Sequence, residues 1–416
     1  MAANLVTGGS YLLELGTGFD SAAFILDTSL LDGPDVLDGD GEDFADITEF
    51  ANNINISRGR QQAEDAFNAG MMTVSMFEIN STRALDPFNT SSIYFNTETN
   101  QPGLGPLRPI RLSRNGEYLY TGKVTSYAQQ YVLGGLTQYT VTAADDLYLL
   151  AQAVLPETAT SSESSAARFT AMLALIPYTG TTSITASPTT TLGAFTIEEG
   201  ANANEYATRI NEAEQGRIFC SRGNVLTMQG RTGSTPDTPT VAFSDTGVGT
   251  KYDTLGVEFD QQAIINSATV EIESGGTPQT ATDAASIAEY FVQAKSITNS
   301  LLSSDGQAAT LADYLLDPIP EPRFTSMSAT FASLTDPQKT ALATIEIGGT
   351  ISMTKTYTSG SPATVLQNLA VEGIDHEINV ATGHRVTLYT SKTILTTNLI
   401  LDDVTYGELD ALNSLG

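Results

Sequence analysis

The chain has 416 residues, more than one hydrophobic core usually accommodates, so we expect two or three packed domains. A hydrophobic share of 41%, with 16 Tyr and 16 Phe, provides enough apolar surface for real cores and argues against overall disorder. The 48 acidic and 19 basic side chains give a net charge of −29, which argues against nucleic acid as a specific ligand because backbone phosphates require Lys and Arg.

The single cysteine, Cys220, cannot form an intrachain disulfide, so a cytosolic site of synthesis is the natural interpretation. We expect a buried thiol without a catalytic role. The first residues contain no basic segment before an apolar stretch, and no later window approaches the roughly 20 apolar residues that span a bilayer. These features predict a chain that is neither secreted nor held in a membrane.

The N-terminal part, residues 1–150, is predicted to be β-rich, with an exposed acidic loop at residues 30–46. Residues 1–57 contain 11 acidic side chains and no Lys or Arg. Alternating apolar positions then indicate a half-buried strand that ends at Gly59. Residues 145–153 predict a short helix with acidic residues at its N-terminus.

The sharpest local signal is the pair Asn115-Gly116 between two alternating runs. Both central residues of a two-residue hairpin turn must tolerate positive φ, and Asn-Gly does so readily. We therefore predict a tight hairpin here.

Composition divides the rest of the chain into three parts. Residues 151–200 are rich in Ser, Thr and Ala around one predicted helix and form a boundary region; residues 201–330 are mixed α and β; residues 331–416 return to strands. The predicted fold class is thus mainly β with an α+β middle region.

Within the middle region, residues 202–215 predict a helix that ends at Gly216 and leads into a two-stranded hairpin. Two further helices are predicted, at residues 283–299 and 305–317, capped by Asp283 and Asp305.

The acidic loop offers the best candidate metal site. Five carboxylates occupy positions 1, 3, 5, 9 and 12 of a calcium-loop pattern: Asp38, Asp40, Glu42, Asp46 and Glu49. The pattern requires Gly at position 6, where the chain has Asp43, and no paired helices are predicted on either side. A solvated acidic loop is therefore favoured over calcium binding, and no other cofactor is expected.

No catalytic motif is present. His376 and His384 are the only histidines, lie in strand-like context and lack a nucleophile elbow, so we expect structural roles. The neighbouring carboxylates at 145–146 and 198–199 do not define an acid pair for glycoside hydrolysis, because neighbours in sequence say little about separation in space. Gly pairs occur without the Lys-Ser/Thr context of a phosphate loop.

One long stretch contains four short motifs in order: D-I-T-E-F at residues 46–50, I-S-R-G-R at 56–60, F-N-A-G at 67–70 and D-P-F-N-T-S-S-I-Y at 86–94. This series resembles the opening module of siphophage minor tail proteins and baseplate hub proteins. The similarity continues with R-P-I-R at residues 108–111 and with the helix-hairpin segment at residues 212–231. Two departures are a long acidic loop before Asp46 and the pair Gly349-Thr350 in a C-terminal strand.

The resemblance implies small β-barrel tail-hub domains, one in residues 1–150 and one in residues 331–416, in a subunit that forms a homotrimeric ring around a DNA channel. The implied function is structural and not enzymatic: a virion protein of the tail tip that ends the tail tube. The implied partners are the distal tail protein, the tape-measure protein and tail fibres. DNA would pass without specific binding, along a wall that we expect to be more acidic than basic.

Two other functions remain open at this point. A hexameric distal tail adaptor would use one barrel per subunit, and the two β-rich ends favour two. A receptor-binding or carbohydrate-degrading tail protein is less favoured, because the chain has no Trp for stacking on sugars.

Overall fold

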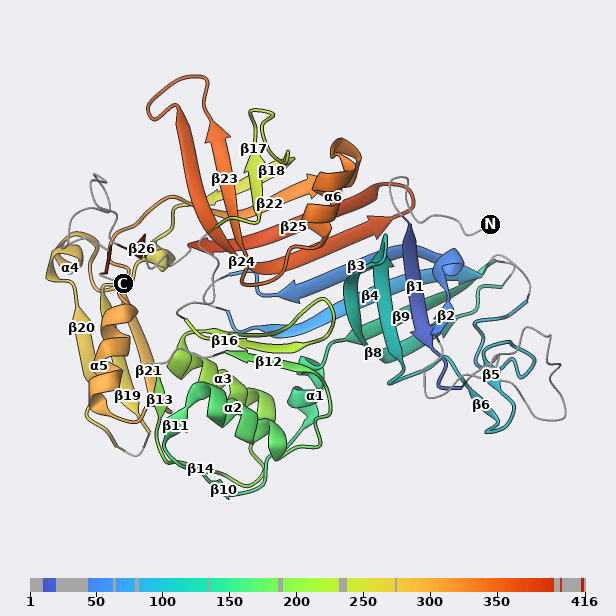
Figure 1. Cartoon of the computed structure of the whole chain (residues 1–416), viewed down its shortest axis with the longest axis horizontal. Helices are drawn as coiled ribbons and strands as arrows, with labels where there is room; N and C mark the ends of the chain where they lie inside the picture. The colour runs from blue at the N-terminus through green and yellow to red at the C-terminus, as the bar shows by residue number, and fades with distance from the viewer. Residues whose placement is uncertain are drawn as a thin grey trace.

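The computed structural model describes residues 10–19, 44–62, 65–78, 82–133, 135–185, 190–231, 238–273 and 275–392, together with two short strands near the C-terminus. The chain is mainly β, and one large sheet occupies the upper right part of the molecule in Figure 1. The smaller sheets and most helices form the lower and left parts. No helix within the described ranges is both long and apolar enough to cross a membrane.

The large sheet has thirteen strands, and eleven of them follow the order β18-β22-β25-β24-β3-β4-β9-β8-β7-β1-β2, with β23 pairing to β24 and β17 to β23. Their bounds are β1 (Tyr11–Gly16), β2 (Phe44–Asp46), β3 (Ala51–Gly59), β4 (Asn68–Glu78), β7 (Pro109–Arg114), β8 (Glu117–Gln130), β9 (Thr137–Ala144), β17 (Val241–Ser244), β18 (Thr254–Glu258), β22 (Arg323–Thr330), β23 (Thr350–Thr356), β24 (Thr364–Asn379) and β25 (Gly383–Lys392).

The middle of the chain forms a second unit with its own apolar core. Its helices and strands are α1 (Leu147–Gln152), β10 (Thr158–Ala159), β11 (Glu163–Ser164), α2 (Ser165–Ala174), β12 (Thr182–Thr185), β13 (Thr191–Leu192), β14 (Thr196–Ile197), α3 (Ala203–Glu214), β15 (Arg217–Cys220), β16 (Leu226–Gln229), β19 (Ser267–Ile272), β20 (Gln279–Thr282), α4 (Ala284–Tyr290), β21 (Ala294–Ser300) and α5 (Asp305–Tyr314). Figure 1 shows α2 and α3 side by side below β16, and α5 beside β19.

The remaining elements are short or cover the large sheet. They are the 3-10 turns at Thr48–Phe50, Gln261–Ala263 and Phe331–Ser333, the helix α6 (Asp336–Ala343), and the strands β5 (Phe95–Asn96), β6 (Gln101–Pro102), β26 (Thr397–Asn398) and β27 (Asn413–Ser414). Leu342 and Ala343 of α6 belong to the same buried apolar cluster as the strands of the large sheet.

The separate barrels expected at the two ends of the chain are not observed. The N-terminal and C-terminal strands instead join into one open sheet, because β3 pairs with β24 in register over Gly59↔Gly373 to Asn53↔Asn379. The strand β24 is 16 residues long, so its first half can pair with β23 while its second half pairs with β3. Within the described residues no closed barrel forms, since the path ends at β2 on one side and β18 on the other.

Several local predictions are confirmed. Asn115 and Gly116 have φ of 52° and 85°, and Arg114 pairs with Glu117, so the hairpin has a two-residue turn. Asp283 accepts a hydrogen bond from the Ser286 amide and caps α4.

Other local predictions are wrong in detail. The helix expected over residues 283–299 ends at Tyr290, because Phe291 turns the backbone to φ 61° and the following residues pair with β19 as a strand. Helix α3 ends in a left-handed Gln215, before Gly216, and the cap of α5 is Ser304, with Asp305 in the first turn.

A buried carboxylate joins the middle unit to the large sheet. Glu372 of β24 is 1% exposed and accepts hydrogen bonds from Arg60, Arg217 and Ser391 at 2.9, 2.6 and 2.7 Å. Burial alone would raise its pKa, but the charges of Arg217 and Arg60 outweigh burial and hold the pKa of Glu372 below its usual value. Because Arg217 belongs to β15 and Arg60 follows β3, this ion pair network holds the two units together.

Candidate functional site

The candidate calcium loop lies mostly where the structure gives no description. Asp38, Asp40 and Glu42 fall outside the described residues. Asp46 accepts a hydrogen bond from the Thr48 amide at 2.9 Å, and Glu49 is exposed. Among the described residues no three His, Cys, Asp or Glu side chains are grouped so that they could hold a metal ion.

The two histidines form a buried hydrogen-bonded chain inside the large sheet. The Tyr11 hydroxyl lies 2.8 Å from Nδ1 of His384, and Nε2 of His384 lies 3.0 Å from Nδ1 of His376. Burial, followed by the charge of Arg58, lowers the pKa of His376 to about 3; burial also lowers the pKa of His384. Neutral, enclosed histidines in contact with the Phe331 ring fit a packing role.

The other titratable candidates are also enclosed or isolated. Burial raises the pKa of the Cys220 thiol well above its usual value, so the thiol is unreactive. Burial raises the pKa of Asp145 to about 7, and its carboxylate accepts hydrogen bonds from the Gly70 and Leu147 amides, which supports the start of α1. Glu198 and Glu199 are exposed neighbours.

The most organised surface feature is the loop at residues 82–96, between β4 and β5. Asp86 lies at its centre, is 2% exposed, and accepts hydrogen bonds from the Phe88 amide, the Arg83 guanidinium and the Tyr131 hydroxyl. Burial opposes ionisation, but these donors outweigh it and hold the pKa of Asp86 below its usual value. The loop is therefore fixed around a buried charge.

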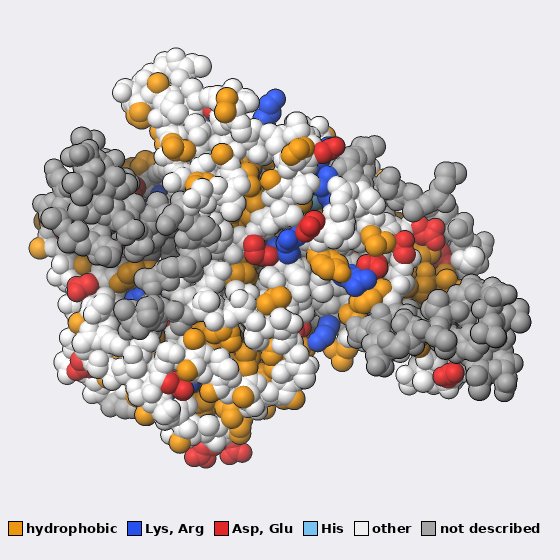
Figure 2. All heavy atoms as spheres, in the orientation of Figure 1, with side chains coloured by type: hydrophobic (Ala, Val, Ile, Leu, Met, Phe, Trp, Pro, Cys, Tyr) orange, Lys and Arg blue, Asp and Glu red, His pale blue; other side chains and the backbone are white. Residues whose placement is uncertain are grey.

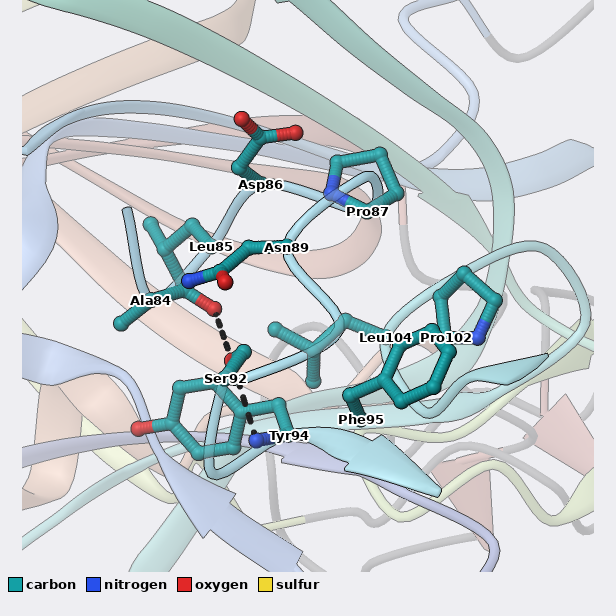
Figure 3. A pocket seen from close by; sticks show the side chains of 10 residues that line it. All are labelled: Ala84, Leu85, Asp86, Pro87, Asn89, Ser92, Tyr94, Phe95, Pro102 and Leu104. Carbon is teal, nitrogen blue, oxygen red and sulfur yellow. Dashed lines mark hydrogen bonds between the residues drawn. The ribbon is translucent and has the colours of Figure 1, made fainter. Parts of the chain in front are cut away.

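Further side chains close the loop on itself. The Asn89 amide donates to the carbonyls of Thr82 and Arg83 at 3.1 and 2.9 Å, and the Ser92 hydroxyl donates to the Ala84 carbonyl at 2.6 Å. Figure 3 shows Ser92 between Ala84 and the Tyr94 amide. Such side-chain to backbone bonds give a loop one preferred conformation without a helix or strand.

The cavity inside this loop does not hold a ligand. Its volume is about 10 Å³. That is about the space of a single water molecule. Leu85 and Leu104 line the cavity and belong to the apolar core of the large sheet (Figure 3). The loop is thus anchored to the core on its inner side.

On its outer side the loop presents large apolar side chains to solvent. Phe88 and Ile93 are 79% and 70% exposed. The turn between β8 and β9 touches the loop through the Tyr131–Asp86 hydrogen bond at 3.1 Å, and its Leu133 and Leu136 are also exposed. We call these four side chains, with Tyr131, the loop–turn surface.

Apolar side chains on a rigid, internally satisfied loop are a feature of protein contact surfaces. A flexible loop would lose conformational entropy when it binds, whereas this loop is already ordered by the bonds of Asp86 and Asn89. Exposed apolar patches of this kind mark sites of protein interaction.

The solvent side of the large sheet has a different character and forms a second candidate surface. Two cross-strand rows run over β4, β3, β24 and β25; they are Thr73, Asn55, Glu377, Arg385 and Met71, Ser57, Asp375, Thr387. We call these eight side chains the polar face. A hollow of about 320 Å³ lies over them.

The polar face carries a small net negative charge. Two acidic side chains, Asp375 and Glu377, stand against one basic side chain, Arg385, in a chain whose net charge is −29. Met71 is the one large apolar residue among the eight.

Two solved tail proteins have a similar architecture. The tail protein from Neisseria meningitidis MC58 superimposes with a TM-score of 0.58 over 91% of this chain and 96% of its own, at 12% identity. The 43 kDa tail protein of prophage MuSo2 from Shewanella oneidensis does so with a TM-score of 0.58 over 93% of this chain and 99% of its own, at 11% identity. The chain has the fold of phage tail proteins. At these identities the likeness concerns the fold and does not by itself transfer a function.

No protein-family model matches the chain, and none of the curated proteins matches it. The likeness to tail proteins is therefore one of three-dimensional fold. The motif D-P-F-N-T-S-S-I-Y is, in the structure, the loop at residues 86–94.

The sequence analysis singled out residues 86–94 as a motif but did not predict an ordered loop with exposed apolar side chains there. Phe88 and Ile93 stand between turn-forming residues and outside any alternating pattern, which was a usable signal for exposed apolar side chains. The polar face was harder to predict from the sequence, because it depends on the pairing of β3 with β24, which are more than 300 residues apart.

Proposed function

We propose that this chain is a structural subunit of the phage tail tip, a hub protein that assembles into a ring at the end of the tail tube. The observation that carries the proposal is the tail-protein fold over more than nine tenths of the chain. The fold comes with two surfaces suited to assembly and passage, and the described residues include no group of three His, Cys, Asp or Glu side chains that could hold a metal ion.

In this proposal the loop–turn surface contacts a neighbouring subunit. Burying Phe88, Ile93 and Leu133 would remove large apolar groups from water, at about 25 cal/mol for each Å² buried. The loop's fixed conformation suits a repeated contact, because each subunit of a closed ring must present the same surface in the same geometry.

The polar face in turn faces the passage through the ring. Asp375 and Glu377 outnumber Arg385 there, which agrees in sign with an acidic wall that repels DNA phosphates. Ser, Thr and Asn side chains between the charges provide a wettable surface without fixed binding points for a phosphate backbone.

The number of subunits is the next element of the proposal. We infer three copies, which at 44.0 kDa each give 3 × 44.0 = 132 kDa. A hexameric distal tail adaptor would give 6 × 44.0 = 264 kDa. The distal tail protein, the tape-measure protein and tail fibres are the proposed neighbours of the ring in the virion.

The test is the mass of the purified chain by native mass spectrometry, together with the double variant Phe88→Ser, Ile93→Ser. We expect a trimer for the unmodified chain and monomers for the variant. Phe259→Ser is the matched control, because Phe259 is also exposed, at 66%, but follows β18, which lies five strands away from β4 in the large sheet. Monomers of the unmodified chain over a wide concentration range, or hydrolysis of host polysaccharide by it, would contradict the proposal.

A further inference from the structure

A second set of exposed apolar side chains comes from β18 and the residue after it, from the residues that follow α4 and from the residues that follow α5; in Figure 1, α4 lies at the opposite end of the molecule from β5. Five side chains from three segments form it, and all are about half exposed or more; they are Val257 at 53%, Phe259 at 66%, Phe291 at 79%, Val292 at 46% and Ile319 at 65%. We call them the Phe259–Phe291 patch. Figure 2 shows acidic and basic side chains close together near the centre of the face of the molecule drawn there.

A buried asparagine connects two of the three segments, the one with Phe291 and Val292 and the one with Ile319. Asn266 is 0% exposed; it donates to the Phe291 carbonyl at 2.8 Å and accepts from the Gln293 amide at 2.7 Å. It also donates to Ser286, whose hydroxyl donates to the Pro318 carbonyl at 2.7 Å, next to Ile319. The patch is therefore built from the inside and is not a chance cluster on loose loops.

The backbone at Phe291 is strained. Its φ of 61° and ψ of 174° lie in a region that essentially only glycine adopts. A bulky residue in this conformation persists only because surrounding bonds enforce it, here those of Asn266. Since the Phe291 ring is 79% exposed, this strain serves no packing inside the chain.

The patch continues into an unpaired sheet edge. Strand β18 hydrogen-bonds to β22 and, among the described strands, to no other, so its outer edge can accept another strand. Val257 belongs to this strand and Phe259 follows it. Beside them lies a groove of about 480 Å³, lined in part by Glu258, Asp260, Glu321 and Arg323.

The charge around the patch selects the partner. Glu258, Asp260 and Glu289 are exposed. The two basic side chains that line the groove are already paired, Lys392 with Glu321 and Arg323 with Asp317, whereas Glu258 and Asp260 form no ion pair with any Lys or Arg that the structure describes. A partner that carries basic side chains would neutralise these carboxylates, whereas an acidic partner would be repelled.

A second copy of this chain fits poorly. Thirteen of its 19 basic side chains already form ion pairs within the chain. Its most basic run, the strand β7 with the residue before it, is paired on both sides, to β1 and β8. Residues 393–416 contain no Lys or Arg and four acidic residues, so the chain's own C-terminal segment has the wrong charge.

We propose that the Phe259–Phe291 patch and the free edge of β18 together dock an extended segment of another protein, in which basic and apolar side chains alternate. The segment adds a strand to β18 by main-chain hydrogen bonds. Its apolar side chains cover Phe259 and Phe291, and its basic side chains meet Glu258 and Asp260. This proposal does not depend on how many subunits form the ring.

The test uses the full chain and a fluorescein-labelled peptide that alternates Lys with Val and Phe. Binding is measured by fluorescence anisotropy, with a second peptide that has Glu in place of Lys. We expect the basic peptide to bind at least about tenfold more tightly, a ratio equivalent to about 1.4 kcal/mol. Glu258→Lys should weaken its binding several-fold, and Phe88→Ser, at the other end of the molecule, should leave the affinity unchanged.

Phe291→Gly separates docking from a structural role. Glycine adopts the observed backbone angles without strain, so this variant should keep or raise the midpoint of thermal unfolding and still weaken peptide binding, further so together with Phe259→Ser. Equal binding of the two peptides, unchanged affinity in the double variant, or a lower unfolding midpoint for Phe291→Gly would overturn the proposal. So would a change in the chain's oligomeric mass on these substitutions, which would identify a second copy as the occupant.

Discussion

Replacing Glu372 by Gln should reveal how strongly the middle unit is held to the large sheet. The substitution keeps the shape of the side chain but leaves Arg60 and Arg217 without their shared counter-charge, at side-chain exposures of 15% and 13%. Removing one partner of a buried ion pair costs about 3–5 kcal/mol. Because both guanidinium groups retain some contact with water, we expect the lower end, about 3 kcal/mol.

The measurement is the free energy of unfolding in urea, followed by far-UV circular dichroism because the chain has no Trp. Glu321→Gln is the matched control, since its ion pair with Lys392 is 3.2 Å long and both side chains are about half exposed. Pairs of that kind contribute about 0.2–1 kcal/mol.

The difference in stability between the unmodified chain and the Glu372→Gln variant should also depend on pH in a fixed direction. The folded chain holds the pKa of Glu372 below its usual value of 4.5, so the stabilisation is fully present above pH 4.5. It should then decrease as the pH falls through the folded-state pKa. A loss below about 1 kcal/mol at pH 7, or equal losses for Glu372→Gln and Glu321→Gln, would refute this account of the junction.

Three further predictions concern other parts of the chain. His376 has a pKa of about 3 in the folded chain and near 6.5 in the unfolded chain, so the free energy of unfolding should fall as the pH drops below 6.5. His376→Gln should flatten this pH dependence between pH 5 and 6 by up to about 1.4 kcal/mol per pH unit. An unchanged slope would contradict a neutral histidine in the folded chain. Asp86→Ala should expose residues 82–96 to limited proteolysis and destabilise the chain by about 1–3 kcal/mol, and an unchanged cleavage pattern would contradict its role in the loop. Gly116→Ala should destabilise the folded chain by about 1 kcal/mol, because Gly116 has a φ of 85° although the space around it is open. Gly105→Ala is the control and should have little effect, because Gly105 also lies in open space but does not have a positive φ. Equal effects of the two substitutions would contradict the turn geometry.

Local signals in the sequence predicted local structure well. The Asn115-Gly116 turn and the cap at Asp283 depend on φ preferences and on hydrogen bonds within a few residues, which sequence spacing expresses directly. The prediction of a helix after Tyr290 was wrong. The apolar residues there suit either a helix or a strand, and the parallel pairing with β19 makes the segment a strand.

Long-range pairing was the part that sequence patterns could not supply. The expected barrels required each β-rich region to close on itself, but β24 is long enough to bond both β23 and β3, and this joins the two ends of the chain in one sheet. The same pairing creates the polar face. The backbone strain at Phe291 could not be predicted from the local sequence either, because it depends on a hydrogen bond from Asn266, which lies 25 residues earlier.

The most direct test of the proposed function is an electron cryomicroscopy reconstruction of the assembled chain. Our account predicts a closed ring of three copies, with the polar face of Asn55, Asp375 and Glu377 lining the central opening and the loop at residues 82–96 at the contacts between subunits. A monomer, or a ring in which the polar face points outward, would contradict it.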